Sequence, residues 1–296
     1  MNLEDLVGPI EWVREGKGYI MCPAEELHST PTKRKDTILY TDNVPTIFCL
    51  HSQCKGAIRE ANVALRAALR GEGWTPKKPT AEQREAYARR QELTCKCERL
   101  AKYKEEVLDR SAWPVSDILK DSAPITDEWQ QFLNLWPESD IMWSGDPMDS
   151  GQYSNAANFK TVRLWKQYAT SPYPFVCGTA FRAGSYSRTK DSVQDRRFIV
   201  VECDDLDPNP EVNKNLSGAV INFVRQRGWT LRAIVDSGNK SIHGWFEYPS
   251  EEQEEWATYV LPALNVDTAT LRPTQPVRAV GIERENGNKQ KLLWIN

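Results

Sequence analysis

The stretch Phe198-Ile-Val-Val-Glu202-Cys-Asp204-Asp205 decides the fold of the C-terminal half, because an apolar run leads directly into acidic residues. Its β-branched residues predict a strand. Glu202 and Asp204 are two residues apart, so both side chains project from the same face of that strand. Two such carboxylates repel each other unless a divalent cation lies between them, and such ions clamp phosphates in phosphoryl transfer. The stretch therefore indicates a cation site, although acids also cluster where a strand meets a loop.

Strand and helix patterns continue on both sides of this stretch and define the fold class. We expect strands at residues 175–181, 197–203, 231–236, 243–248 and 292–295. We expect helices at residues 124–135, 159–169, 216–228 and 251–264. Elements mixed in this order predict an α/β or α+β sheet domain, and we expect an α+β domain with a mixed sheet over residues 115–296.

A second block, Ser237-Gly-Asn-Lys240-Ser241-Ile-His243, joins two of these strands through a glycine turn. Ser241 and His243 share one face of the second strand. The turn exposes backbone N–H groups that suit phosphate oxygens, and Lys240 adds positive charge. A lone histidine is more often a buried ring, but this combination favours a phosphate site.

A third block, Leu264-Asn-Val-Asp267, supplies another acid that would complete the cation site. Arg278 follows it and is suited to bind a triphosphate through two parallel hydrogen bonds.

The three blocks, in this order, resemble the archaeo-eukaryotic primase superfamily, in particular the primase-polymerase proteins of phages, plasmids and other mobile elements. The matching residues are Glu202-Cys-Asp204, Ser241-Ile-His243 and Asp267. The resemblance implies an RRM-like core, in which these acids bind catalytic Mg²⁺ or Mn²⁺. It also implies a site for the incoming nucleotide, made by Lys240, Ser241, His243 and Arg278.

Two features depart from the family pattern, and three functions remain open. The first acid is Glu202 rather than the commoner aspartate, and Arg278 lies in Val-Arg-Ala-Val-Gly rather than Arg-x-Pro-Gly. The resemblance favours a nucleotidyltransferase, a DNA primase or polymerase, that makes primers or extends DNA. Its partners would be a single-stranded DNA template, nucleoside triphosphates and a separate replicative helicase. The alternatives are a DNA-binding replication-initiation protein that has lost polymerisation, and a metal-dependent nuclease.

The N-terminal part carries a candidate zinc site. Cys22 and His28 form one close pair, and Cys49 and Cys54 form a second pair about twenty residues later. Two such pairs on tight turns are typical of a structural zinc site, which replaces a hydrophobic core that a small unit cannot build alone. His51 is the rival for the fourth ligand, and three unlinked cysteines are the alternative. The unit also resembles, loosely, the zinc-binding modules that accompany primases.

The charge of the chain bears on whether it binds nucleic acid. The 38 basic and 41 acidic residues give a net charge of −3, which argues mildly against a nucleic-acid partner. Between Lys55 and Lys104, however, 13 basic residues stand against 6 acidic ones. That segment is suited to lie against phosphates, although a solvated charged helix has the same composition.

Domain boundaries and location follow from the same survey. We expect a zinc-binding domain at residues 1–73, a charged helical linker at 74–114 and the catalytic domain at 115–296. Residues 80–108 read as one helix capped by Thr80. No apolar run approaches the length of a bilayer span, and Met1 to Val13 lacks the basic start of a signal peptide. We therefore expect a cytoplasmic protein, in the host cytoplasm if the gene is viral.

Overall fold

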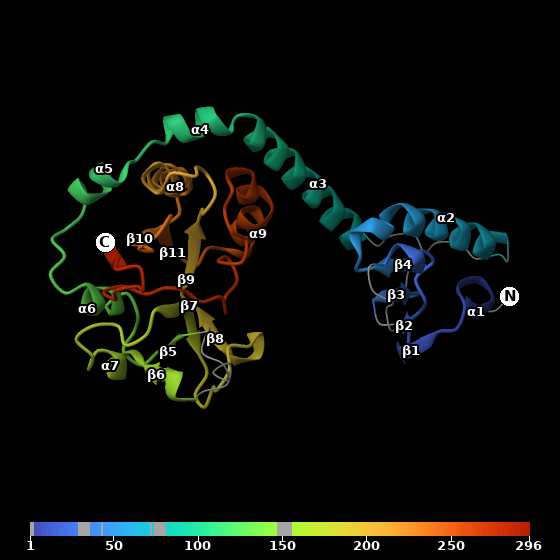
Figure 1. The fold of residues 1–296 in the computed structure, drawn as a ribbon, viewed down its shortest axis with the longest axis horizontal. Helices are drawn as coiled ribbons and strands as arrows, with labels where there is room; N and C mark the ends of the chain where they lie inside the picture. The colour runs from blue at the N-terminus through green and yellow to red at the C-terminus, as the bar shows by residue number, and fades with distance from the viewer. Residues whose placement is uncertain (1–2, 29–35, 43, 72, 74–80, 147–155) are drawn as a thin grey trace. The chain divides into compact units, whose positions relative to one another are not determined.

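A computed structural model describes residues 3–28, 36–42, 44–71, 73, 81–146 and 156–296 (Figure 1). The chain divides into two compact units, residues 1–87 and 88–296, and each is described by itself. The expected cap at Thr80 lies outside the described residues. No helix in the described part is long and apolar enough to cross a membrane.

The N-terminal unit is a four-stranded antiparallel sheet with one long helix. Its strands follow one another in the order β1 (Glu11–Arg14), β2 (Lys17–Tyr19), β3 (Thr37–Tyr40) and β4 (Thr46–Cys49). The helices are α1 (Leu3–Val7) and α2 (Lys55–Gly71), with 3-10 turns η1 (Glu25–Leu27) and η2 (Ser52–Cys54). Asn62 of α2 accepts from the backbone N–H of Ile47 at 2.7 Å and donates to its carbonyl at 2.8 Å. These two bonds fix the helix to β4.

The charged segment expected as one helix forms two, α3 (Ala81–Lys102) and α4 (Lys104–Arg110), which are separated at Tyr103. Few apolar side chains occur here, and three of them are buried in the core of the C-terminal unit: Leu93, Leu100 and Leu108. From residue 88 onward the segment therefore packs as part of that unit.

The main sheet of the C-terminal unit has the strand order β13-β10-β11-β9, with every pair antiparallel. Its strands are β9 (Phe198–Glu202), β10 (Leu231–Asp236), β11 (Ile242–Glu247) and β13 (Lys291–Ile295). Each lies within two residues of its predicted bounds. In the register of the sheet, His243 on β11 is directly opposite Glu202 on β9.

A second antiparallel sheet has the order β12-β7-β5-β6, and β8 also pairs with β7. Its strands are β5 (Ile141–Gly145), β6 (Phe159–Thr161), β7 (Phe175–Phe181), β8 (Val193–Arg196) and β12 (Val277–Arg278). The α+β class is thus confirmed, but the expectation of a mixed sheet is wrong, because every strand pair among the described residues is antiparallel.

The helix expected over residues 159–169 is also wrong. Residues 159–161 form β6, and the helix that follows, α7 (Val162–Trp165), has only 4 residues. Thr161 ends the strand and caps this short helix by accepting from the backbone N–H of Leu164. The indole N–H of the buried Trp165 then donates to the carbonyl of Met142 at 2.9 Å, which ties the turn to β5.

Two cores lie on the two faces of the main sheet. Ile199 and Val201 of β9 join a core with α8 (Pro210–Arg225) and α9 (Glu251–Val260), over which α3 and α4 pack (Figure 1). Phe198 and Val200 join a core with α6 (Glu128–Leu133), α7 and parts of the second sheet. Because strand side chains alternate, Glu202 points to this second face. The remaining helix is α5 (Val115–Lys120).

Candidate functional site

Glu202 and His243 form a buried pair at the end of β9. Nε2 of His243 lies 2.9 Å from Oε1 of Glu202, and their side chains are 1% and 14% exposed. The hydroxyl of Ser241 donates to the same carboxylate oxygen at 3.1 Å. Burial raises the pKa of Glu202, but His243, Ser241 and Arg278 outweigh it and hold that pKa below its ordinary value. The sheet register therefore brings two predicted residues, Ser241 and His243, to the ionised carboxylate of Glu202.

Arg278 lies on β12 of the second sheet, and its charge lowers the pKa of Glu202. Its guanidinium stacks 4.0 Å from the ring centroid of Phe175. Burial and the neighbouring Arg284 lower the pKa of Arg278, whereas Glu202 and Asp204, among other acids, raise it. The negative charges of Glu202 and Asp204, the two acids of the first block, therefore both act on the guanidinium of Arg278.

Asp267 reaches the site because β9 is an edge strand. The backbone carbonyls of Glu202 and Val200 point to the open side of β9, where no neighbouring strand of the main sheet donates a hydrogen bond to them. Instead the backbone N–H of Asp267 donates to the Glu202 carbonyl at 2.9 Å, and the hydroxyl of Thr270 donates to that of Val200 at 3.0 Å. Covering this edge fixes the backbone of Asp267 beside Glu202.

The three predicted acids come near each other without forming a closed cation site. Asp204 and Asp267 are exposed, and one oxygen of Asp267 accepts from the backbone N–H of Ala269 at 2.8 Å. Within the described residues, only a Cys/His cluster brings three or more potential ligand atoms within 4.8 Å of one another. The oxygen of Glu202 is instead engaged by Ser241 and His243.

Lys240 lies on the turn between β10 and β11. Its ammonium is 3.4 Å from Asp205, the acid next to Asp204, and both side chains are solvent-exposed. The turn itself is closed by Ser237, whose hydroxyl donates to the carbonyl of Ser241 at 2.8 Å. Gly238 takes a φ of +70° there, a conformation that other residues rarely adopt.

Asn213 on α8 holds these two loops together. Its amide donates to the carbonyls of Cys203 and Lys240, both at 2.9 Å, and its oxygen accepts from the backbone N–H groups of Leu206 and Asp207. The side chain is fully buried. Sequence reasoning missed Asn213, and also Arg284, which donates to the Ser237 carbonyl at 2.9 Å. No local motif marks either residue, because both act on segments remote in the chain.

The second predicted site is a compact cluster in the N-terminal unit. The ligand atoms of Cys22, His28, Cys49 and Cys54 all lie within 4.8 Å of one another. Nε2 of His28 is 3.1 Å from Sγ of Cys54 and 3.6 Å from Sγ of Cys49. These separations suit ligands around one tetrahedral ion with metal–sulfur bonds of about 2.3 Å. The cluster can hold a metal ion such as zinc.

The local environment favours a thiolate at Cys49. Burial raises its pKa, but hydrogen bonds from Thr37 and from the backbone and ring of His51 outweigh this and lower the pKa to about 6. His51 lies 3.5 Å from Cys49 through Nδ1, and its ring packs 4.0 Å from that of His28. His51 thus lies beside the four clustered residues rather than among them.

Comparison with known proteins adds no assignment: no family model, curated protein or solved structure matches this chain.

Proposed function

We propose that the C-terminal unit is a template-dependent nucleotidyltransferase of the primase-polymerase kind, which makes or extends primers on single-stranded DNA. One observation carries the proposal. The register of β9 and β11 pairs Glu202 with His243, so two blocks predicted from separate motifs meet at one carboxylate. Asp267, from the third block, is bonded through its backbone to Glu202. These contacts support the motif assignment independently of its spacing.

Each residue has a role that its position supports. Arg278, which feels the acids at the end of β9, would bind the phosphates of an incoming nucleotide. Lys240 and the N–H groups of its turn would add contacts to the same phosphates. The ionised Glu202 keeps His243 oriented toward the site. Nε2 of His243 faces Glu202 and Nδ1 is buried, so His243 would donate to a phosphate oxygen only if a bound nucleotide brought that oxygen within reach of Nδ1.

The chain offers ligands for two kinds of metal ion, one in each unit. Glu202, Asp204 and Asp267 offer the carboxylate oxygens that Mg²⁺ or Mn²⁺ prefers, and such a cation would stabilise charge on the reacting phosphate. In the N-terminal unit, three thiols and one imidazole are the ligands typical of structural zinc. We propose zinc for that cluster, with a role in folding rather than in chemistry.

Nucleotide incorporation on single-stranded DNA tests the proposal, with ribonucleotides and deoxyribonucleotides supplied separately. Asp204→Ala should abolish incorporation, because it removes an exposed acid from the strand end without disturbing buried packing. Asp117→Ala is the control, since Asp117 is a half-exposed acid on α5 whose one ion pair within the described part of the chain is with Lys120. A fully active Asp204→Ala variant would refute the site assignment.

One observation favours a second candidate, a DNA-binding replication protein without polymerase activity. Glu202 is bound by Ser241 and His243 rather than grouped with Asp204 and Asp267. Intact DNA binding with no pyrophosphate release from any nucleotide would establish this alternative. Loss of labelled DNA in the same reactions would instead indicate a nuclease.

A further inference from the structure

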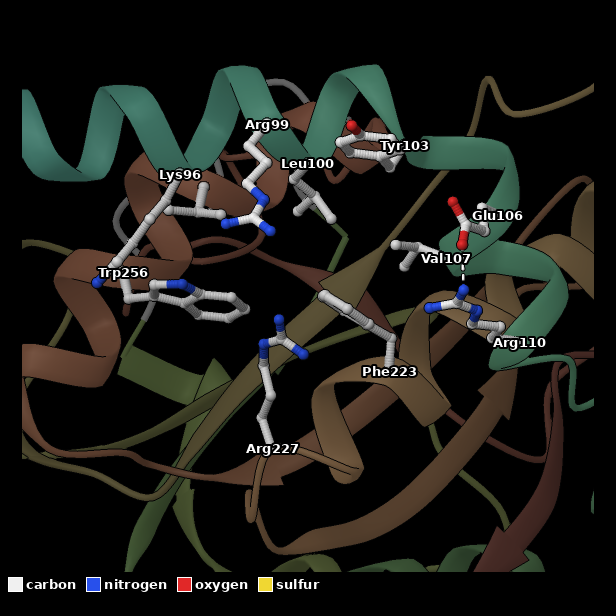
Figure 2. A pocket seen from close by; sticks show the side chains of 11 residues that line it. Lys96, Arg99, Leu100, Tyr103, Glu106, Val107, Arg110, Phe223, Arg227 and Trp256 are labelled. Atoms are coloured by element: carbon white, nitrogen blue, oxygen red, sulfur yellow. Dashed lines mark hydrogen bonds and ion pairs between the residues drawn. The ribbon is translucent and has the colours of Figure 1, made fainter.

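A pocket of about 520 Å³ opens between α3, α4, α8 and α9 of the C-terminal unit (Figure 2). Eleven residues line it: Lys96, Arg99, Leu100, Tyr103, Glu106, Val107, Arg110, Phe223, Arg227, Trp256 and Val260. Four of the eleven are basic and one is acidic, in a chain whose net charge is −3. Such a local excess of positive charge suits an anionic ligand.

Two of these cations have no acidic partner among the described residues. Figure 2 shows Arg99 reaching into the pocket from α3 and Arg227 reaching toward it from the opposite wall, just beyond the end of α8. The other two are paired: Lys96 with Glu92 at 2.7 Å, and Arg110 with Glu106. Desolvation alone lowers the pKa of Arg227, with no acid to offset it. Arg99 and Arg227 together therefore form a site prepared for an anion.

Aromatic rings flank these guanidinium groups. The guanidinium of Arg227 lies 3.8 Å from the ring centroid of Phe223 and 5.3 Å from that of Trp256. Trp256 is only partly buried and its ring extends into the pocket, while Tyr103, at the opposite end, is 45% exposed. Flat rings beside cations are what a nucleotide requires, since its base stacks while its phosphate is neutralised.

This pocket is separate from the Glu202 site. Its walls α8 and α9 pack on the face of β9 that carries Ile199 and Val201, whereas Glu202 points to the opposite face. Phe223 belongs to the core on that first face. A ligand in the pocket would thus lie on the other side of the sheet from the acids.

We infer that this pocket binds single-stranded nucleic acid, with one base against Trp256 and the adjoining phosphates on Arg99 and Arg227. The inference deepens the proposed function, because it names where a template strand is held apart from the chemistry. The pocket is partly open to solvent, so a strand can enter and leave it. A peptide of acidic residues would use the cations but would not use the partly exposed ring of Trp256.

Fluorescence anisotropy with a labelled single-stranded oligonucleotide tests the inference on the full chain. Arg99→Gln and Arg227→Gln should each weaken binding at least about fivefold and reduce the salt dependence by about one released counterion. Arg90→Gln is the matched control, because Arg90 is an exposed arginine of the same helix that does not line the pocket. It should bind like the wild type. Binding by both pocket variants equal to the wild type would overturn the inference.

Photocrosslinking identifies the occupant. A 5-iodouracil oligonucleotide should crosslink to Trp256 or Tyr103, and an unlabelled strand should compete far better than a mononucleotide or polyglutamate. Equal competition by either of the last two would refute a strand-binding pocket. Asp117→Ala, which lies outside the pocket, should retain full binding. If the wild type incorporates no nucleotide while the pocket variants still lose strand binding, the proposed function would be refuted. The inference about the pocket would not be affected.

Discussion

Replacing Cys49 by serine should remove the metal from the N-terminal unit and unfold that unit. Among the residues of this unit that the structure describes, four buried aliphatic side chains form the main core: Ile20, Leu39, Ile47 and Leu65. Burying each contributes roughly 1.5–3 kcal/mol. A structural zinc site contributes about 10–16 kcal/mol in small domains, as much as this whole core. Losing the ion should therefore leave the unit unable to hold its sheet.

Two measurements follow the effect of Cys49→Ser. Metal analysis of the purified protein should fall from about one zinc per chain to near zero. Hydrogen exchange should show lost protection in β3 and β4, with protection retained in β10 and β11 of the C-terminal unit. Cys95→Ser is the control, because Cys95 is an exposed cysteine of α3 outside the cluster.

The two histidines supply the decisive comparison. His28→Gln should lose zinc, because His28 belongs to the four clustered residues. His51→Gln should keep zinc, since His51 lies beside the four clustered residues and is not one of them. Unchanged zinc in Cys49→Ser, or zinc lost from His51→Gln and kept in His28→Gln, would refute the ligand set.

Two further predictions concern the C-terminal unit. The pKa of Glu202 lies below its ordinary value of 4.5, so its pair with His243 stabilises the fold fully above that value and is lost as the pH falls through the folded pKa. The difference in unfolding free energy between wild type and Glu202→Gln should accordingly shrink below about pH 4.5; a constant difference in denaturant titrations from pH 6 to pH 3 would contradict it. Gly218→Ala should cost about 1–3 kcal/mol in the same titrations, because a Cβ there would lie 2.2 Å from the carbonyl oxygen of Trp113. Gly56→Ala, on α2 of the N-terminal unit and with open space around it, should cost nothing in the unfolding of that unit, and equal costs for the two substitutions would show that crowding is not the cause.

The sequence predicted those elements that their own residues determine. β7 and β10 have the predicted bounds, since each is a continuous strand-forming run that ends at a polar or glycine-containing turn. β6 could not be predicted, because Phe159–Thr161 is a strand only through its pairing with β5. The low apolar content of α3 concealed its role in a core, since Leu93 and Leu100 are buried by distant helices.

From the sequence we predicted Ser241 and His243 as site residues, and both lie against Glu202, but the pairing itself was not predicted. The motif spacing placed Glu202 and Asp204 on one face, and the shared cation remains a prediction. The structure instead pairs Glu202 with His243, a contact set by the register of two strands about forty residues apart. Asn213 was beyond sequence reasoning, because its four hydrogen bonds join loops that no local pattern connects.

The position of β9 explains how three separated blocks converge. An edge strand leaves alternate carbonyls without a partner strand, and these need donors from elsewhere. Thr270 and Asp267 satisfy two of them, at Val200 and Glu202, so the hydrogen bonding that protects the edge also delivers the third acid. On the inner side, Asn213 and Ser217 both donate to the carbonyl of Cys203. The acidic end of β9 is therefore held by its backbone, which leaves the carboxylates of Asp204 and Asp267 exposed for a ligand.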